Sequence, residues 1–198
     1  MKINPIRGTH DLFGKEIEKF NRIILEVRDT ARKFGFGELN TPIFESSELF
    51  KKPLGEQSDV VLKEMYTFSD RNENEITLRP EYTTPMIRAA IHNSLLNKLP
   101  AKFFGTGPMF RRERPQKGRY RQFNQINFEI LGTKEFLADV ELIFLSNNIL
   151  RELLPKSKIR LQINSLGDKK TLIDFKKNLT IYFKNYKKKL SEESIKKI

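Results

Sequence analysis

Cationic, acidic and aromatic side chains gather around one turn of the chain. Between residues 112 and 125 five cations surround one proline and one glycine, and strand-like runs flank them at 103–113 and 122–133. Successive residues of a strand point to opposite faces of a sheet. Pairing of the two runs would therefore bring one set of side chains to a common surface, namely Arg111, Glu113, Phe123, Gln125 and Glu129.

These side-chain types suit a nucleotide and amino-acid site. Guanidinium groups match phosphate oxygens with paired donors, an aromatic ring can stack on a base, and carboxylates accept hydrogen bonds from amines. Gly118 would let the turn close over a ligand. An exposed, salt-bridged hairpin that keeps a sheet edge soluble has the same alternation, so alternation alone leaves both interpretations open.

Three helices are expected in the first 154 residues. Apolar residues at helical spacing predict helices over 16–34, ending near Gly35, and over 136–154, where most faces are apolar and burial follows. Thr84 as N-cap and Pro85 at the first helical position predict a helix that continues to Leu99.

Short strands complete the predicted fold. A hairpin is expected from 65–68 and 76–79, and further strands at 38–45, where Pro42 belongs at an edge or boundary, and at 159–163. Gly105-Thr106-Gly107 predicts a bend between strands rather than a phosphate loop, because no third glycine and no Gly-Lys-Ser/Thr follow in register. Helices with mainly hairpin-connected strands indicate an α+β fold.

The composition is that of a globular protein of 198 residues, 38% hydrophobic and 31% charged. No apolar run is long enough to span a bilayer, and the amino terminus lacks the apolar core of a signal peptide, so we expect a cytoplasmic location. The absence of cysteine excludes disulfides and thiol catalysis. His10 and His92 stand apart from other ligand types, which favours a surface or core role and no metal site.

The last thirty residues differ in charge from the rest. Residues 169–198 contain ten lysines against three carboxylates, so they supply +7 of the net +12. An amphipathic, lysine-coated helix is predicted over 172–190, and Ser191 is a candidate N-cap of another. Clustered lysines attract polyanions, while a solvated helical face explains them equally well. The composition shift predicts a boundary that separates 1–168 from 169–198.

The residues from Phe110 to Phe123, continued to Glu129, resemble motif 2 of class II aminoacyl-tRNA synthetases in the form found in histidyl-tRNA synthetases. Arg7-Gly8-Thr9 with Asp11 resembles the opening of that family, and the first helix with the Pro42 strand resembles motif 1. Similar blocks occur at 63–68 and 78–81, so the resemblance covers essentially all of residues 1–168.

The resemblance implies an ATP site in the basic turn. Arg111 would bind the α-phosphate and stabilise the charge that develops during adenylate formation, and Arg119 would hold the γ-phosphate. Glu113 would accept from the adenine amino group while Phe123 stacks on the ring. In this family ATP usually arrives with Mg²⁺, although the sequence shows no metal cage.

The resemblance also implies a histidine site. Glu81, Thr83 and Gln125 would grip the α-amino group, and Glu129 would bind the imidazole. Tyr82 departs from the glycine that the family often has there, and its phenol is expected to point away from the amino acid. The implied activity is histidine activation by ATP and transfer to the 3′ end of tRNA(His), in a homodimer formed through the first helix and the Pro42 strand.

Several family elements have no counterpart in these residues, among them motif 3 and the anticodon-binding domain. The expectation is an amino-terminal fragment of an α+β catalytic core, incomplete at its C-terminal end and inactive alone, with residues 169–198 entering a helical insertion domain that approaches tRNA. A non-catalytic paralogue like the histidine-sensing subunit of ATP phosphoribosyltransferase is an alternative, and a basic RNA-binding module is another. The intact set Arg111, Glu113, Arg119 and Phe123 favours the enzyme over the sensor.

Overall fold

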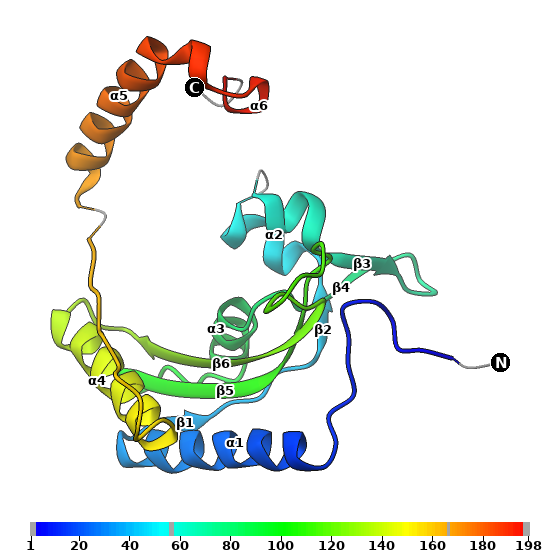
Figure 1. Cartoon of the computed structure of the whole chain (residues 1–198). Coiled ribbons are helices and arrows are strands. Elements are labelled where there is room, and N and C mark those ends of the chain that lie inside the picture. Colours follow the sequence, from blue (N-terminus) through cyan, green and yellow to red (C-terminus); the bar gives the residue numbers. More distant parts are fainter. Residues whose placement is uncertain (1–2, 56–57, 166, 196–198) are drawn as a thin grey trace. The chain divides into compact units, whose positions relative to one another are not determined.

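A computed structural model describes residues 3–55, 58–165 and 167–195. The chain divides into two compact units, residues 1–157 and 158–198 (Figure 1). In the described residues no helix is long and apolar enough to cross a membrane. The first unit contains both sheets, and the second is helical.

The main sheet is built on one long hairpin. Strands β5 (Ala101–Phe110) and β6 (Gln122–Leu131) pair antiparallel, with Met109 opposite Phe123 and Phe103 opposite Glu129. The short strand β1 (Gly37–Glu38) joins the other edge of β5 in parallel, so the order is β1-β5-β6. The predicted strands around the basic turn are confirmed, and so is the pairing that places their odd-numbered residues on one face.

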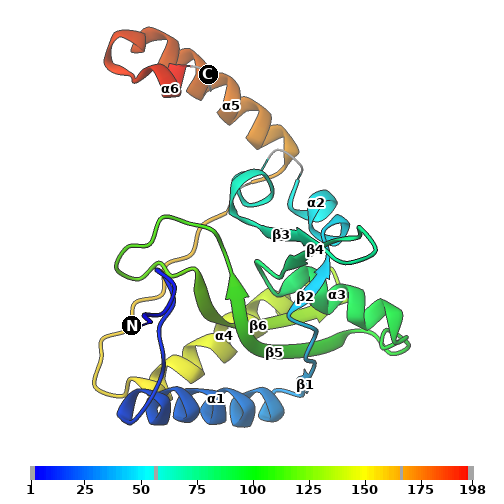
Figure 2. The same ribbon diagram turned by 90° about the vertical axis from the view of Figure 1, so that its right-hand side faces the viewer.

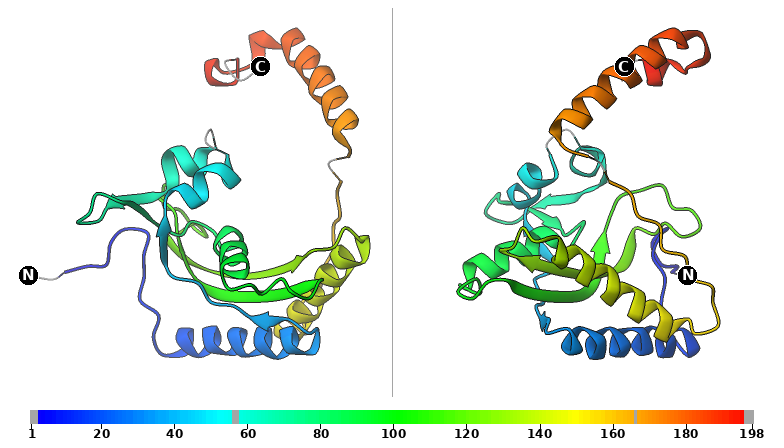
Figure 3. Two further views of the ribbon diagram at one scale, coloured as in Figure 1. Left: turned by 180° about the vertical axis from the view of Figure 1, so that it is seen from behind. Right: turned by 90° about the vertical axis from the view of Figure 1, so that its left-hand side faces the viewer.

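Helices α1 (Lys15–Lys33) and α4 (Phe136–Leu153) cover the even-numbered face of this sheet (Figures 1 and 3). The apolar stripe of α1 and the inner residues of α4 meet the sheet in one buried core, formed by Val27, Ala31, Phe36, Phe104, Leu145 and Ile149. Leu142 and Leu153 of α4 are half-buried against this core. Several other apolar residues of the helix are exposed, including Phe136 at 69% and Leu137 at 62%. The prediction that this helix is buried is therefore wrong for most of its faces.

Helix α3 (Thr83–His92) covers the odd-numbered face through a second core of Tyr82, Met86 and Met109. The predicted helix to Leu99 is seven residues too long. It stops because the Asn93 side chain donates to the Ala89 carbonyl oxygen at 2.8 Å and Ser94 adopts a positive φ of 54°. The Thr84 N-cap is also wrong by position, since the helix begins at Thr83.

The second sheet has the order β2-β4-β3 and is antiparallel throughout. Its strands are β2 (Phe44–Ser46), β4 (Glu75–Leu78) and β3 (Tyr66–Ser69), and the last two form the predicted hairpin. The buried Thr77 hydroxyl lies 2.8 Å from the hydroxyls of both Ser47 and Thr67, which satisfies polar groups under the sheet. Two short helices, α2 (Glu48–Leu54) and η1 (Val60–Glu64), follow β2 in the chain.

The single strand predicted at 38–45 is wrong, because the chain leaves one sheet and enters the other within it. Leu39 still donates to the Phe104 carbonyl oxygen at 2.8 Å, and β2 then begins at Phe44. Pro42 lies in the crossing, which confirms its place at a boundary. There the carbonyl oxygens of Thr41 and Pro42 accept hydrogen bonds from the Arg79 guanidinium.

The second unit consists of α5 (Lys169–Asn185), a 3-10 turn η2 (Lys187–Lys189) and α6 (Glu192–Ile195). Asp168 caps α5 by accepting from the Thr171 backbone N–H at 2.7 Å, and this hydrogen bond lowers the pKa of the Asp168 carboxyl. Ser191 caps α6, as predicted. The alternating residues 159–163 form no strand, because in the described chain no second strand pairs with them.

Gly105 and Gly107 lie in the middle of β5, so the predicted bend at this position is wrong. Their missing side chains instead leave room for two packed groups (Figure 2 gives the strand's position). A Cβ at Gly105 would lie 2.5 Å from Tyr82 Cε1, and one at Gly107 would lie 2.4 Å from an Arg79 guanidinium nitrogen. The close approach of buried side chains thus requires glycine at both positions.

Substituting Gly105→Ala should destabilise the first unit by about 1–3 kcal/mol, because overpacking forces Tyr82 or the strand to move. Urea unfolding with an unchanged m-value measures the loss. Gly37→Ala is the matched control, since its Cβ would meet no atom closer than 3.8 Å. Equal midpoints for the two variants would contradict the packing argument.

Candidate active site

A pocket of about 410 Å³ opens where the β5–β6 hairpin extends into its basic turn. All four residues predicted to bind ATP line it, together with three neighbours; the lining is Arg111, Glu113, Gly118, Arg119, Tyr120, Phe123 and Asn124. Strand alternation had already placed Arg111, Glu113 and Phe123 on one face. Only the folded turn brings Arg119 back over them.

Arg111 is held so that part of its guanidinium remains available. Its Nε donates to the Pro80 carbonyl oxygen at 2.9 Å, and its guanidinium carbon lies 5.4 Å from the Phe123 ring centroid. Neither Nη atom makes a hydrogen bond to a residue that the structure describes. A guanidinium that is fixed at one edge and stacked on a ring can present the other donors to an oxyanion without losing much entropy on binding.

Glu113 and Arg119 form an ion pair across the pocket mouth. Glu113 Oε2 lies 3.2 Å from Arg119 Nη1, yet this buried oxygen accepts no hydrogen bond from any residue that the structure describes. The contact is close enough for charge attraction but is poorly aligned. Because the Arg119 side chain is 66% exposed, the pair stabilises little and can open at low cost. Its opening would release a carboxylate acceptor and a guanidinium donor together.

Glu81 serves as a helix cap in addition to being a candidate substrate ligand. Its Oε2 accepts from the Thr83 N–H at 2.7 Å and its Oε1 from the Thr84 N–H at 2.9 Å. These are two of the donors that the first turn of α3 leaves unpaired. Each carboxylate oxygen keeps a second lone-pair site, so the capping bonds fix the carboxylate while leaving it able to accept from an ammonium.

Tyr82 is fully buried, and its phenol donates to Asn40 Oδ1 at 3.1 Å. The Arg79 guanidinium carbon lies 4.4 Å from its ring centroid. The hydroxyl is therefore committed to the loop after β1. Residues on both sides of Glu81 along the chain are thus anchored, Arg79 in the crossing and Tyr82 against β5.

Asn127 joins the two residues predicted to contact opposite ends of histidine. Its Nδ2 donates to Glu129 Oε1 at 2.8 Å and lies 3.4 Å from Thr83 Oγ1. The neighbouring Gln125 has a buried Oε1 without a hydrogen-bond partner in the described structure. In β5 the residues opposite Gln125 and Asn127 are Gly107 and Gly105, so this polar row faces strand positions without side chains.

Asn127 was assigned no role in the sequence analysis. Its signal was the alternation with Gln125 and Glu129, which already indicated a shared face. The pocket-lining residues Tyr120 and Asn124 were also missed, because their contribution depends on the path of the turn. The four residues predicted to bind ATP thus line one pocket. Of the four predicted to bind histidine, Thr83 and Glu129 are linked through Asn127, Glu81 caps α3 beside Thr83, and Gln125 has no partner for its oxygen among the described residues. The Arg111 bond to Pro80 connects the pocket to the segment beside Glu81.

Metal ligands do not cluster in the part of the chain that the structure describes: it contains no group of three or more His, Cys, Asp or Glu side chains that could hold an ion. A Mg²⁺ ion at this site would have to receive its oxygen ligands mainly from a bound nucleotide and from water.

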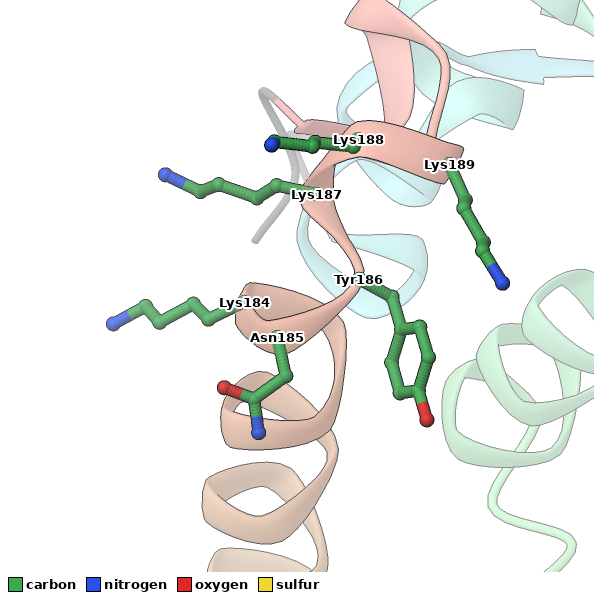
Figure 4. A pocket seen from close by; sticks show the side chains of 6 residues that line it. All are labelled: Lys184, Asn185, Tyr186, Lys187, Lys188 and Lys189. Carbon is green, nitrogen blue, oxygen red and sulfur yellow. The ribbon is translucent and has the colours of Figure 1, made fainter.

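The second unit carries a separate basic cluster at the end of α5 (Figure 4). A shallow pocket of about 430 Å³ is lined there by Lys184, Asn185, Tyr186, Lys187, Lys188 and Lys189. In Figure 4 the amines of Lys184, Lys187 and Lys188 lie on one side, whereas Tyr186 and Lys189 lie on the other. The Lys189 amine is 5.6 Å from the Tyr186 ring centroid.

Solved structures share the architecture of about three quarters of this chain. Apo histidyl-tRNA synthetase of S. aureus superposes with a TM-score of 0.64 at 31% identity over 76% of this chain and 35% of that one. A Bacillus halodurans protein described as an ATP phosphoribosyltransferase regulatory subunit/histidyl-tRNA synthetase gives 0.66 at 22% identity over 77% of this chain and 38% of that one, which shows the fold alone. A mainly antiparallel sheet that is flanked by helices and ends in the basic hairpin is the architecture of a class II aminoacyl-tRNA synthetase core.

A family model described as histidyl-tRNA synthetase matches residues 8–179, and the chain belongs to that family. It is 48% identical to the histidine–tRNA ligase of Ehrlichia chaffeensis over 193 residues, which are 98% of this chain and 46% of that protein. The ligase of Gluconobacter oxydans is 47% identical over 192 residues, 97% of this chain and 46% of that protein. The chain thus spans about half the length of the curated relatives that it matches.

Glu81→Ala should lower the free energy of unfolding by about 1 kcal/mol, because two backbone N–H groups of α3 lose their acceptor. Glu81→Gln retains one accepting oxygen and should lose less. Urea unfolding of the three proteins measures the order. If Glu81→Ala matched the wild-type midpoint, the carboxylate would have no capping role.

Proposed function

We propose that this chain carries the ATP and histidine sites of a histidine–tRNA ligase, which forms histidyl-adenylate and transfers histidine to the 3′ end of tRNA(His). The observation that carries the proposal is the common pocket of Arg111, Glu113, Arg119 and Phe123. Two guanidinium groups, a free carboxylate oxygen and a ring are the groups that phosphates, an amine and a base would need.

ATP would lie along this pocket with its base against Phe123. The adenine amino group would donate to the orphaned Glu113 Oε2, and Arg119 would leave that carboxylate to bind the γ-phosphate. Arg111, fixed through Pro80, would meet the α-phosphate. Mg²⁺ bound with the nucleotide would neutralise part of the triphosphate charge.

Histidine would lie on the adjoining polar row of β6. Its ammonium would bind to Glu81, Thr83 and Gln125, where the Gln125 oxygen has no other partner among the described residues. Its imidazole would bind to Glu129, whose orientation Asn127 fixes. The histidine carboxylate then attacks the α-phosphorus and displaces pyrophosphate, which leaves histidyl-adenylate. The protein therefore contributes positioning and charge stabilisation and needs no nucleophile of its own.

The protein would also contact tRNA and a second copy of itself. Residues 169–198 would begin a helical insertion domain, and the lysines near Tyr186 would meet the phosphates of tRNA. Two copies would associate through α1 and the segment around Pro42, where apolar side chains are exposed, including Leu25 at 60% and Phe44 at 57%. We place the enzyme in the cytoplasm, where its substrates are made.

A histidine-sensing regulatory subunit is the second candidate, because the B. halodurans protein shares the fold. Such a sensor needs the histidine site but no triphosphate clamp. The assembled pocket around Arg111 therefore favours the ligase. ATP binding that strengthens in the presence of histidine would distinguish the two, since a pure sensor should bind histidine alone.

Arg111→Ala should slow histidine-dependent ATP–pyrophosphate exchange by about 10²–10³-fold or more, because it removes the donors aimed at the charged transition state. The assay uses the protein as its source cell makes it. Arg114→Ala is the matched control, since Arg114 is an exposed cation of the same turn and does not line the pocket. Normal exchange in Arg111→Ala would remove this residue from the phosphate site.

Glu129→Ala should raise the KM for histidine by at least about tenfold, the usual effect of losing a charge-assisted hydrogen bond of roughly 1.5–3 kcal/mol. The KM for ATP should change little, because Glu129 is not part of the pocket lining. Steady-state exchange with each substrate varied in turn measures both constants. An unchanged histidine dependence would exclude Glu129 from the imidazole site.

A further inference from the structure

The amino-terminal segment Ile6–His10 lies against the basic turn between β5 and β6 (Figure 2). The Gly8 carbonyl oxygen accepts from the Arg121 N–H at 2.7 Å and from the Gln122 N–H at 3.4 Å. Thr9 closes a turn onto Ile6 through its backbone N–H at 2.9 Å and its hydroxyl at 2.7 Å. This turn fixes the carbonyl of Gly8 in the direction of the hairpin.

Two side chains of the basic turn pack on Gly8 from opposite ends of that turn. A Cβ built on Gly8 would lie 2.8 Å from Arg121 Cγ and 3.0 Å from Pro115 Cγ. Gly8 also has a positive φ of 91°, which side-chain-bearing residues rarely adopt. Both the space and the backbone conformation therefore require glycine at this position.

The contact reaches the ATP pocket through Arg121. The Arg121 carbonyl oxygen accepts from the Arg111 N–H at 2.9 Å, and the Arg121 Nε donates to the Glu113 carbonyl oxygen at 3.3 Å. Tyr120, which lines the pocket, has its ring centroid 4.9 Å from that of His10. Gly8 thus holds the residue that is bonded to the backbone of both Arg111 and Glu113.

We propose that Ile6–His10 is a positioning strap for the basic turn and that Gly8 is its positioning residue. The strap presets the separation of Arg111, Glu113 and Tyr120 in the free protein, so that ATP need not order the turn when it binds. Its value for ATP affinity rests on the proposed ligase function. Its effect on the turn itself does not.

The first test measures backbone hydrogen exchange in the chain as it stands, without ligand. Gly8→Ala should speed exchange of the Arg121, Gln122 and Arg111 amides severalfold, because their bonded arrangement loses its support. Gly14→Ala is the matched control: Gly14 also has a positive φ, of 53°, but a Cβ there would meet no atom within 4 Å. Unchanged exchange at these amides in a folded Gly8→Ala protein would overturn the strap.

A milder variant covers the case in which Gly8→Ala fails to fold. His10→Ala removes only the ring contact with Tyr120 and should speed exchange in the same turn by a smaller factor. If Gly8→Ala unfolds and His10→Ala exchanges like the wild type, the strap is also overturned, because the segment then stabilises the whole unit rather than the turn.

The second test concerns the ligand and uses the protein as its source cell makes it. Gly8→Ala should weaken ATP binding severalfold and leave the KM for histidine near its wild-type value. Equal ATP affinity with faster amide exchange would show that the strap orders the turn without serving ATP, which contradicts the positioning role. If the wild-type protein binds no ATP, the proposed function fails, while the exchange measurement still decides whether the strap exists.

Discussion

The hydrogen bonds of the buried Arg79 guanidinium hold the two sheets together. Arg79 follows β4, and its side chain donates to the carbonyl oxygens of Thr41, Pro42 and Pro108. These acceptors lie in the crossing between the sheets and near the end of β5. Its own backbone carbonyl oxygen accepts from the Phe110 N–H at 3.0 Å. A guanidinium that is 3% exposed would be costly without hydrogen-bond acceptors. A shift of one sheet against the other would break several of these hydrogen bonds at once, and it is therefore unfavourable.

The same hydrogen bonds of Arg79 fix the segment that positions the candidate site. Pro80 and Glu81 come directly after Arg79, and Tyr82 is packed under the same guanidinium. Arg111 Nε donates to the Pro80 carbonyl oxygen, so the arginine proposed to bind phosphate and the Glu81 carboxylate that caps α3 are both held by the same short segment. The two groups of site residues therefore keep their separation without direct contact between their side chains. Preorganisation of this kind is what a reaction without a protein nucleophile requires.

The pocket differs from the surroundings of Arg79, because it is open to solvent and its Glu113–Arg119 ion pair is weak. Arg79 is buried, and its Nε and Nη1 donate to backbone carbonyl oxygens, whereas Glu113 and Arg119 attract each other without a hydrogen bond. This difference fits their positions. Arg79 holds the fold together, whereas Arg119 lies on an exposed turn where a ligand can replace its partner Glu113. The strap of Ile6–His10 lies between these extremes, since it fixes the backbone of the turn but leaves the side chains of the pocket free.

Local pattern was sufficient for much of this structure. The extent of α1, the β3–β4 hairpin and the shared face of Phe123, Gln125 and Glu129 followed from helical spacing, turn composition and strand alternation, which act over a few residues. The ligands expected at that face, and the family of the protein, came from the resemblance to motif 2. Tertiary contacts decided the rest: the end of α3, the crossing at Pro42, the exposed face of α4 and the packing of Tyr82 over two glycines. Asn127 and Gly8 acquire their roles from partners 44 and 113 positions away in the chain, Thr83 and Arg121. No periodicity within a segment encodes such a contact, because it depends on where the whole chain places the other partner.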